Sequence, residues 1–263
     1  MLSITTAQIN ALLLAYVFPM VRVMSFLAAA PVFNNTGLPA RVKLITALAV
    51  GFAIAASLQP STDLPDPGSY LGLAILGQQI LIGAGMGFTM RIVFSTLDVA
   101  GELIGLQMGL SFATFFDPQS SGRTSVIAQI FGIVIALIFL ALNGHLMLVE
   151  VLSRSFEWLP ISANPVHAEG WLMLARTGSL LFATGLLLAL PVVVALLITN
   201  IALAVLTRAA PQLNLFAVGF PITSTVGIAV IWLTLPALAN VLERIFDEGF
   251  ESMGMLVRVW AGH

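Results

Sequence analysis

The chain has 263 residues, of which 59% are hydrophobic and only 8% are charged, and its formal net charge is −2. So few charges cannot cover a soluble domain, in which about a quarter of the residues are charged. The composition also excludes the basic field of a nucleic-acid-binding protein, and the absence of cysteine excludes disulfides and thiol chemistry.

Long apolar runs follow one another along the chain. They lie near residues 8–33, 39–59, 70–94, 124–150, 171–207 and 217–240. A helix needs about 20 apolar residues to cross a bilayer, and none of these runs alternates as the strands of a membrane barrel do. We therefore predict an all-α, polytopic membrane protein built of kinked helices and helical hairpins.

The first run, 8–33, contains Pro19 and Arg22. An arginine at the centre of a span costs about 2.5 to 3.5 kcal/mol, which nearly offsets the gain from its apolar neighbours. No basic residue precedes the run, whereas a signal peptide has its positive charge first. We expect a retained helix that inserts only marginally on its own.

The run 171–207 is too long for one span, since at 1.5 Å per residue it makes roughly 55 Å of helix against a hydrocarbon core of about 30 Å. Pro191 lies near its middle. The pattern leaves two alternatives, a kinked hairpin or a single helix that projects well beyond the bilayer.

Glycines recur every fourth residue at Gly101, Gly105 and Gly109, and a shorter pair occurs at Gly83 and Gly87. Small residues on one helical face let another backbone approach closely, which is how membrane helices associate. The predicted faces pack either within this chain or against a separate subunit.

Asp98 and Glu102 lie one helical turn apart beside the longer glycine face. Carboxylates inside a membrane are candidates for proton relay, although the pair is also compatible with a wet cavity or an interfacial position. The three histidines, His145, His167 and His263, are scattered, and no nucleophile is paired with a base. We predict no metal site, no cofactor and no catalytic residue.

A phenylalanine-rich segment follows the glycine face. In "LSFATFFDP" three phenylalanines are followed at once by an Asp-Pro break. The segment is compatible with core packing or with a flexible apolar loop that closes a pore, because short hydrophobic constrictions exclude water and ions.

The pattern changes after Pro236, where an amphipathic helix is predicted. Its apolar positions are Val241, Leu242, Ile245 and Phe246, and its charged positions are Glu243, Arg244, Asp247, Glu248 and Glu251. We expect this tail to lie at the membrane interface or to dock on a partner.

Four segments, in this order, resemble the FliR family of flagellar type III secretion export-gate proteins, whose counterpart in injectisomes is SctT. They are "LPARVKLITALAV" (38–50), "ELIGLQMGLSFATFFDPQSSG" (102–122), "FLALNGHLMLVEVLSRSFEWLPI" (139–161) and "TRAAPQLNLFAVGFP" (207–221). The second and fourth look more like the flagellar branch than the injectisome branch.

The resemblance implies a non-enzymatic subunit of a hetero-oligomeric gate. FliR-like proteins join copies of FliP and FliQ in a closed-ended channel of the bacterial inner (cytoplasmic) membrane, within the flagellar basal body, with FlhB outside it and FlhA nearby. The channel passes unfolded flagellar subunits, and part of the complex projects to the periplasmic side. One chain looks like a fusion of two units. A FliP-like unit comprises residues 1 to about 160 and contains the plug loop 107–121. A helical hairpin unit comprises residues from about 160 to 263 and ends in the amphipathic tail 240–260.

The resemblance also implies residue roles. The plug and pore lining would comprise Gln107, Met108, Leu110, Ser111, Phe112, Thr114, Phe115, Phe116 and Asp117. From the residues themselves, we expect subunit contacts or structural positions at Arg208, Pro211, Asn214, Asp98 and Glu102, and helix contacts at the glycines.

Two other functions are compatible with the residues alone. A stand-alone proton-coupled transporter would use Asp98 and Glu102. A membrane-embedded, lipid-modifying enzyme is the third hypothesis, against which the scattered histidines and missing cysteines count.

Overall fold

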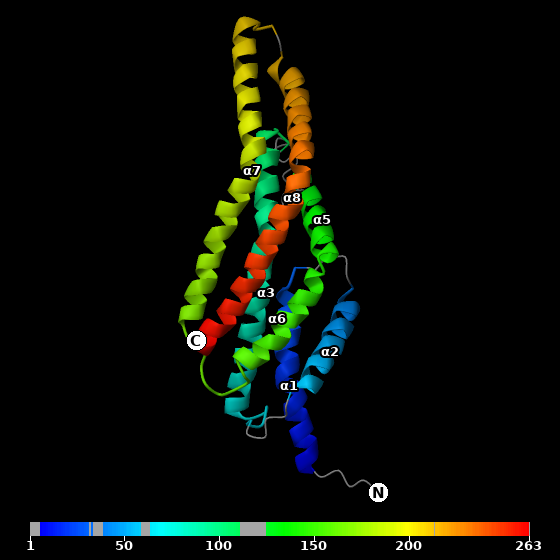
Figure 1. The fold of residues 1–263 in the computed structure, drawn as a ribbon, viewed down its shortest axis with the longest axis vertical. Coiled ribbons are helices and arrows are strands. Elements are labelled where there is room, and N and C mark those ends of the chain that lie inside the picture. The colour runs from blue at the N-terminus through cyan, green and yellow to red at the C-terminus, as the bar shows by residue number, and fades with distance from the viewer. Residues whose placement is uncertain are drawn as a thin grey trace. The chain divides into compact units, whose positions relative to one another are not determined.

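A computed structural model describes residues 6–31, 33, 39–58, 64–110, 125–212 and 214–262. The helices within these ranges are α1 (Thr6–Ala29), α2 (Ala40–Ser57), α3 (Tyr70–Gln107), α5 (Val126–Ala141), α6 (Gly144–Trp158), α7 (Glu169–Ala209) and α8 (Leu215–Ala261) (Figure 1). No strand occurs among the described residues. The prediction of an all-α protein is confirmed.

Four of the described helices, α2, α3, α7 and α8, are long and apolar enough to cross a membrane. The helices α5 and α6 together add a fifth span if they count as one broken crossing. A polytopic membrane protein is therefore confirmed as well.

The long run 171–207 forms one continuous helix, so the hairpin alternative is wrong. Helix α7 has 41 residues with Pro191 inside it, which makes roughly 60 Å of helix. The helix continues on both sides of Pro191, because membrane helices tolerate a proline when the backbone groups that it frees find other hydrogen-bond partners. By contrast, the run 124–150 is interrupted, because Asn143 takes a left-handed conformation (φ 57°) between α5 and α6.

The chain divides into two compact units. Unit 1 consists of Met1–Ile92, Asn143–Thr177 and Asp247–His263, and unit 2 consists of Val93–Leu142 and Gly178–Phe246. The helices α3, α7 and α8 each contribute residues to both units.

Glycines of α3 let α1 approach closely in unit 1. A Cβ at Gly87 would lie 2.6 Å from the Cβ of Ala29, and one at Gly83 would overlap Ser25 and the carbonyl oxygen of Arg22. This shorter glycine pair therefore faces a helix of the same chain.

Unit 2 contains a cluster of three phenylalanines from α3, α5 and α8. The rings of Phe94 and Phe139 are 5.1 Å apart between centroids, and Phe246 lies 5.7 and 5.2 Å from them. On α7, a Cβ at Gly185 would come within 2.9 Å of the carbonyl oxygen of Thr96. Close aromatic and small-residue packing thus joins these helices.

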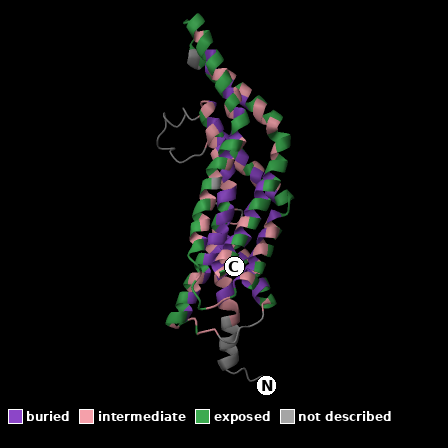
Figure 2. Cartoon of the chain, turned by 60° about the vertical axis from the view of Figure 1, so that its left-hand side comes forward, coloured by how far each residue is buried: buried purple, intermediate pink, exposed green. Residues whose placement is uncertain are grey.

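The predicted amphipathic tail forms the last turns of α8, but its apolar face is covered by this chain itself, except at the predicted apolar position Val241, which is exposed. The buried side chains of the tail are Leu242, Ile245, Phe246, Phe250, Met253, Leu256, Val257 and Trp260. Its charged residues Glu243, Asp247 and Glu251 are exposed, and Figure 2 shows buried and exposed residues interspersed along the helices. The expectation that the apolar face meets the interface or a partner is corrected, since the periodicity identifies the face and not what covers it.

Candidate functional site

The end of α3 and the start of α5 frame the predicted plug segment, and both are built by specific contacts within unit 2. The N–H of Gly109 donates to the carbonyl oxygen of Leu106 (3.1 Å), and that of Leu110 donates to Gly105 (3.0 Å). With Gly109 at φ 81°, this is a Schellman motif, which ends a helix on a left-handed glycine.

Gly109 is therefore not the third member of a helical face, as its spacing predicted. Helix α3 ends at Gln107, and Gly109 lies beyond it. The repeat of four residues cannot distinguish a glycine that admits a neighbouring helix from one that turns the chain, because both roles require the absence of a Cβ.

Met108 is buried at this end of α3, with only 1% of its surface exposed. The hydroxyl of Thr223 in α8 donates to the carbonyl oxygen of Met108 (3.1 Å), and a Cβ at Gly227 would lie 2.8 Å from the Met108 side chain. The prediction that Met108 lines a channel is corrected, because α8 encloses its side chain. Met108 instead fastens the end of α3 to α8.

The start of α5 is capped from two directions. Ser125 accepts a hydrogen bond from the N–H of Ala128 (3.1 Å) through its hydroxyl, which also donates to the carbonyl oxygen of Gly101 (3.2 Å). The N–H of Ser125 donates to a carboxylate oxygen of Glu102 (2.7 Å). Ser125 is thus the N-cap of α5, and Glu102 places negative charge at the positive end of that helix.

Gly101 and Gly105 allow this capping because they bring α3 against the start of α5. A Cβ at Gly101 would lie 2.7 Å from the backbone nitrogen of Ala128, and one at Gly105 would lie 2.8 Å from the Ser125 hydroxyl. Both glycines therefore face α5 of the same chain. We call this arrangement of Gly101, Glu102, Gly105, Ser125 and Ala128 the α3–α5 junction.

The junction holds the start of α5, and the Schellman motif at Gly109 ends α3, so both ends of the segment that joins α3 to α5 are fixed. Of the predicted plug residues, Gln107 and Leu110 are described, and both are half-buried. The other predicted plug residues, Ser111, Phe112, Thr114, Phe115, Phe116 and Asp117, lie outside the described residues. The geometry therefore establishes where the segment is anchored.

The two predicted carboxylates differ in their surroundings. Asp98 is exposed, and a Cβ at Gly132 of α5 would lie 3.8 Å from its carboxylate, whereas Glu102 is half-buried and caps α5. Within the described ranges no three His, Cys, Asp or Glu residues are grouped as metal ligands. The capping bond supplies a structural use for Glu102.

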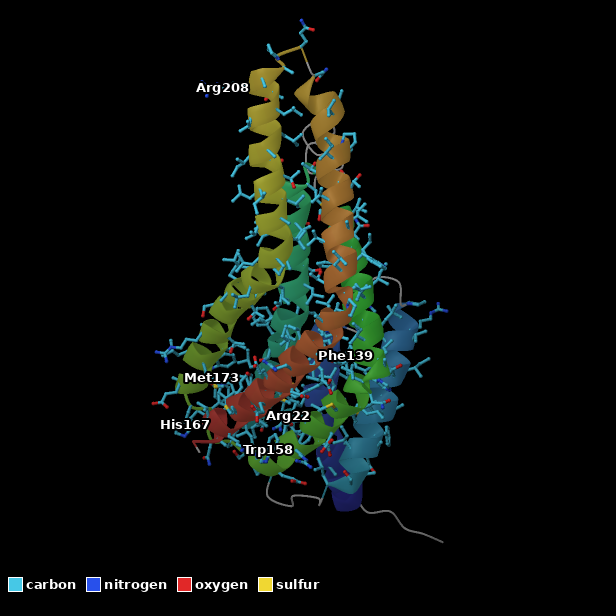
Figure 3. All side chains as sticks on the ribbon, turned by 45° about the horizontal axis from the view of Figure 1, so that its top comes forward. Arg22, Phe139, Trp158, His167, Met173 and Arg208 are labelled. Carbon is cyan, nitrogen blue, oxygen red and sulfur yellow. The ribbon has the colours of Figure 1, made fainter. Side chains whose placement is uncertain are left out.

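The predicted positions Arg208, Pro211 and Asn214 lie at the connection between α7 and α8, where Figure 3 labels Arg208. Arg208 is exposed in the last turn of α7, where a cation complements the helix carbonyls. The side-chain oxygen of Asn214 accepts a hydrogen bond from the N–H of Ala217 (3.4 Å), and its carbonyl accepts one from Val218 (3.1 Å). Asn214 thus begins α8.

Arg22 in α1 is a buried cation whose contacts the sequence did not reveal (Figure 3). Its guanidinium donates to Gln79 of α3 (2.7 Å), to the carbonyl and hydroxyl oxygens of Ser155 (3.0 and 3.2 Å) and to the carbonyl oxygen of Leu159 (2.9 Å). It also lies 4.2 Å from the ring centroid of Phe156.

All these partners of Arg22 are neutral, and those on α6 lie at its carboxyl-terminal end, where the helix dipole is negative. One side chain therefore joins α1, α3 and the end of α6 in unit 1. The signal in the sequence was an arginine within an apolar run, which indicates a charged side chain that is hydrogen-bonded inside the protein.

Comparisons with known proteins match almost the whole chain. The family described as "Bacterial export proteins, family 1" matches residues 13–249. The chain is 44% identical over 257 residues to the flagellar biosynthetic protein FliR of Escherichia coli (strain K12), covering 98% of each chain. The protein of the same name from Pectobacterium carotovorum subsp. carotovorum is 44% identical over 236 residues, covering 90% of each. That of Aquifex aeolicus (strain VF5) is 30% identical over 231 residues, covering 88% of each.

Proposed function

Because this chain belongs to the FliR family of bacterial export proteins and is thus a membrane-embedded subunit of the flagellar export apparatus, we propose that it forms an export channel with FliP- and FliQ-type subunits. The channel lies in the bacterial inner membrane at the flagellar basal body, partly on the periplasmic side, and passes unfolded flagellar subunits. FlhB-type protein contacts its outside, with FlhA-type protein nearby. The chain performs no catalysis and needs no cofactor.

The observation that carries this proposal is the α3–α5 junction. An apolar segment acts as a plug only if its ends are held while its middle enters the channel. The Schellman motif at Gly109 holds one end, and the cap at Ser125 holds the other. Between them Phe112, Phe115 and Phe116 form the seal, together with Leu110 and the polar residues Ser111, Thr114 and Asp117, while Gln107 at the end of α3 contributes to the pore lining. Such a constriction excludes water and ions by dewetting.

The exposed faces of α7 and α8 support assembly with other membrane helices. In their most apolar stretches only 22% and 11% of the residues are buried. Large side chains such as Phe182, Ile198, Val205, Trp232 and Leu233 are more than half exposed. We assign these faces to neighbouring subunits, and Arg208 and Pro211 at the α7–α8 connection to further contacts.

The same proposal gives the two stretches of the chain different counterparts. Residues 1 to about 160 correspond to a FliP-like unit, and about 160–263 correspond to a FliQ-like hairpin unit.

A stand-alone proton-coupled transporter, by comparison, needs Asp98 and Glu102 to exchange protons freely. The hydrogen bond of Glu102 to the Ser125 N–H favours a role in capping.

Native mass spectrometry tests the assembly. The tagged chain is extracted from its native membrane in mild detergent and the intact particle is weighed. We expect a particle several times heavier than the 27.8 kDa chain, with one copy of it among many copies of two smaller membrane proteins. A stable monomer or homodimer that transports protons in vesicles would instead establish the transporter.

Replacing Phe112, Phe115 and Phe116 together by glycine tests the seal. Because the apolar constriction would be lost, the assembled gate should conduct small solutes and ions at rest. The measurement is the ion conductance of cells that express the variant. The matched control replaces the same three residues by leucine, which keeps apolar bulk and should leave the gate closed. A glycine variant that assembles without added conductance would refute the plug.

A further inference from the structure

A cavity of about 250 Å³ lies between the end of α1 and the start of α2 in unit 1. Its lining is mostly apolar, with Met24, Leu27 and Phe33 on one side and Val42, Leu44 and Ala47 on the other. Among its described lining residues Lys43 carries the only charge, and Thr46 adds a hydroxyl. An apolar cavity with one cation suits a ligand that has an apolar body and an anionic group.

Helix α2 places this cavity with respect to the membrane. Its 18 residues span about 27 Å, close to the roughly 30 Å of a hydrocarbon core. Outward-facing side chains such as Ile45 and Phe52 are 65% and 55% exposed. The inner side packs on α1, where a Cβ at Gly51 would lie 3.3 Å from the Met20 side chain.

The charges of α2 are confined to Arg41 and Lys43 in its first turn. A basic pair at one end of an otherwise apolar helix lies at the level of the lipid headgroups, where it attracts anionic lipids. Arg41 is exposed and Lys43 half-buried at the cavity. Pro39, which precedes α2, supplies no side-chain cap, so the positive end of the helix dipole adds to this field.

We infer that the cavity holds part of an acyl chain of an anionic phospholipid, with the headgroup phosphate at Arg41 and Lys43. The cavity volume fits a segment of one acyl chain and not a whole lipid molecule. The rest of the lipid therefore lies along the exposed face of α2. Ala28 of α1 lines the cavity and is exposed. This inference does not depend on the plug.

Photo-crosslinking in the native membrane identifies the occupant. A benzophenone side chain is introduced in place of Ala28 in the full chain, and adducts are identified by intact mass. We expect phospholipid adducts in which phosphatidylglycerol exceeds its share of the membrane several-fold. The same probe in place of Ala56, an exposed residue near the other end of α2, should report the bulk lipid composition.

Two sets of variants separate the headgroup from the acyl chain. Arg41→Gln with Lys43→Gln should return the adducts at position 28 to the bulk lipid ratio, whereas Arg154→Gln, an exposed arginine of α6, should not. Ala28→Trp should reduce the phosphatidylglycerol retained by the purified particle, and Ala56→Trp should not. A protein subunit crosslinked at position 28, no phospholipid adduct there, or equal lipid ratios at positions 28 and 56 would overturn the inference.

Discussion

Replacing Arg22 by lysine should destabilise the protein by about 2–4 kcal/mol, although the charge is kept, because hydrogen bonds to a buried charged group contribute roughly 1.5–3 kcal/mol each. The guanidinium reaches Gln79, Ser155 and Leu159 at once through a planar fork. A lysine ammonium donates from a single atom and cannot span these acceptors. The cost of burying a cation would remain while part of its compensation is lost.

The measurement is the midpoint of thermal unfolding of the purified chain or particle in detergent, together with the amount of chain recovered from the membrane. We expect a lower midpoint and reduced recovery. Arg154→Lys is the matched control, because Arg154 forms an exposed pair with Glu150, and such pairs contribute about 0–1 kcal/mol. If both lysine variants unfold at the same temperature, Arg22 does not fasten α1, α3 and α6.

Replacing Gly101 by alanine should destabilise the α3–α5 junction by about 1–3 kcal/mol, the usual cost of overpacking. The new methyl group would meet backbone atoms of Ala128, which cannot rotate away as a side chain could. Helix α5 would have to move, and the bonds of Ser125 to Gly101 and Glu102 would lengthen.

The control for this prediction lies in the same helix. A Cβ at Gly77 meets nothing within 4 Å, so Gly77→Ala should be neutral or stabilising by up to about 1 kcal/mol from helix propensity. Thermal unfolding and the swimming of cells that carry each variant are the two measurements. Equal stability and equal swimming of the two variants would show that close approach at Gly101 is unimportant.

The glycine spacing illustrates what a local sequence pattern can and cannot predict. It predicted close helix approach at Gly83, Gly87, Gly101 and Gly105, and each of these glycines abuts a neighbouring segment of the same chain. The spacing could not choose between a partner within the chain and a separate subunit, since both present the same backbone. It also misplaced Gly109, whose left-handed conformation depends on where α3 ends.

Met108 shows that a local sequence pattern also does not reveal which residues are buried. In the sequence it stands among apolar residues that resemble a plug, and its neighbours Gln107 and Leu110 are half-buried. Only the packing of α8, with Gly227 and Thr223 against it, encloses Met108. A contact between residues more than a hundred positions apart leaves no periodic signal in either segment.

The sequence by itself determined the all-α, polytopic class, because apolar runs of about 20 residues with few charges have no other stable arrangement in a bilayer. Its motifs also identified the family. Tertiary structure alone decided that α7 is one helix, that the tail of α8 is covered by its own chain, and that neutral groups of α3 and α6 surround Arg22. The physical reason is that hydropathy and periodicity are properties of a segment, whereas these outcomes depend on which distant segment supplies the facing atoms.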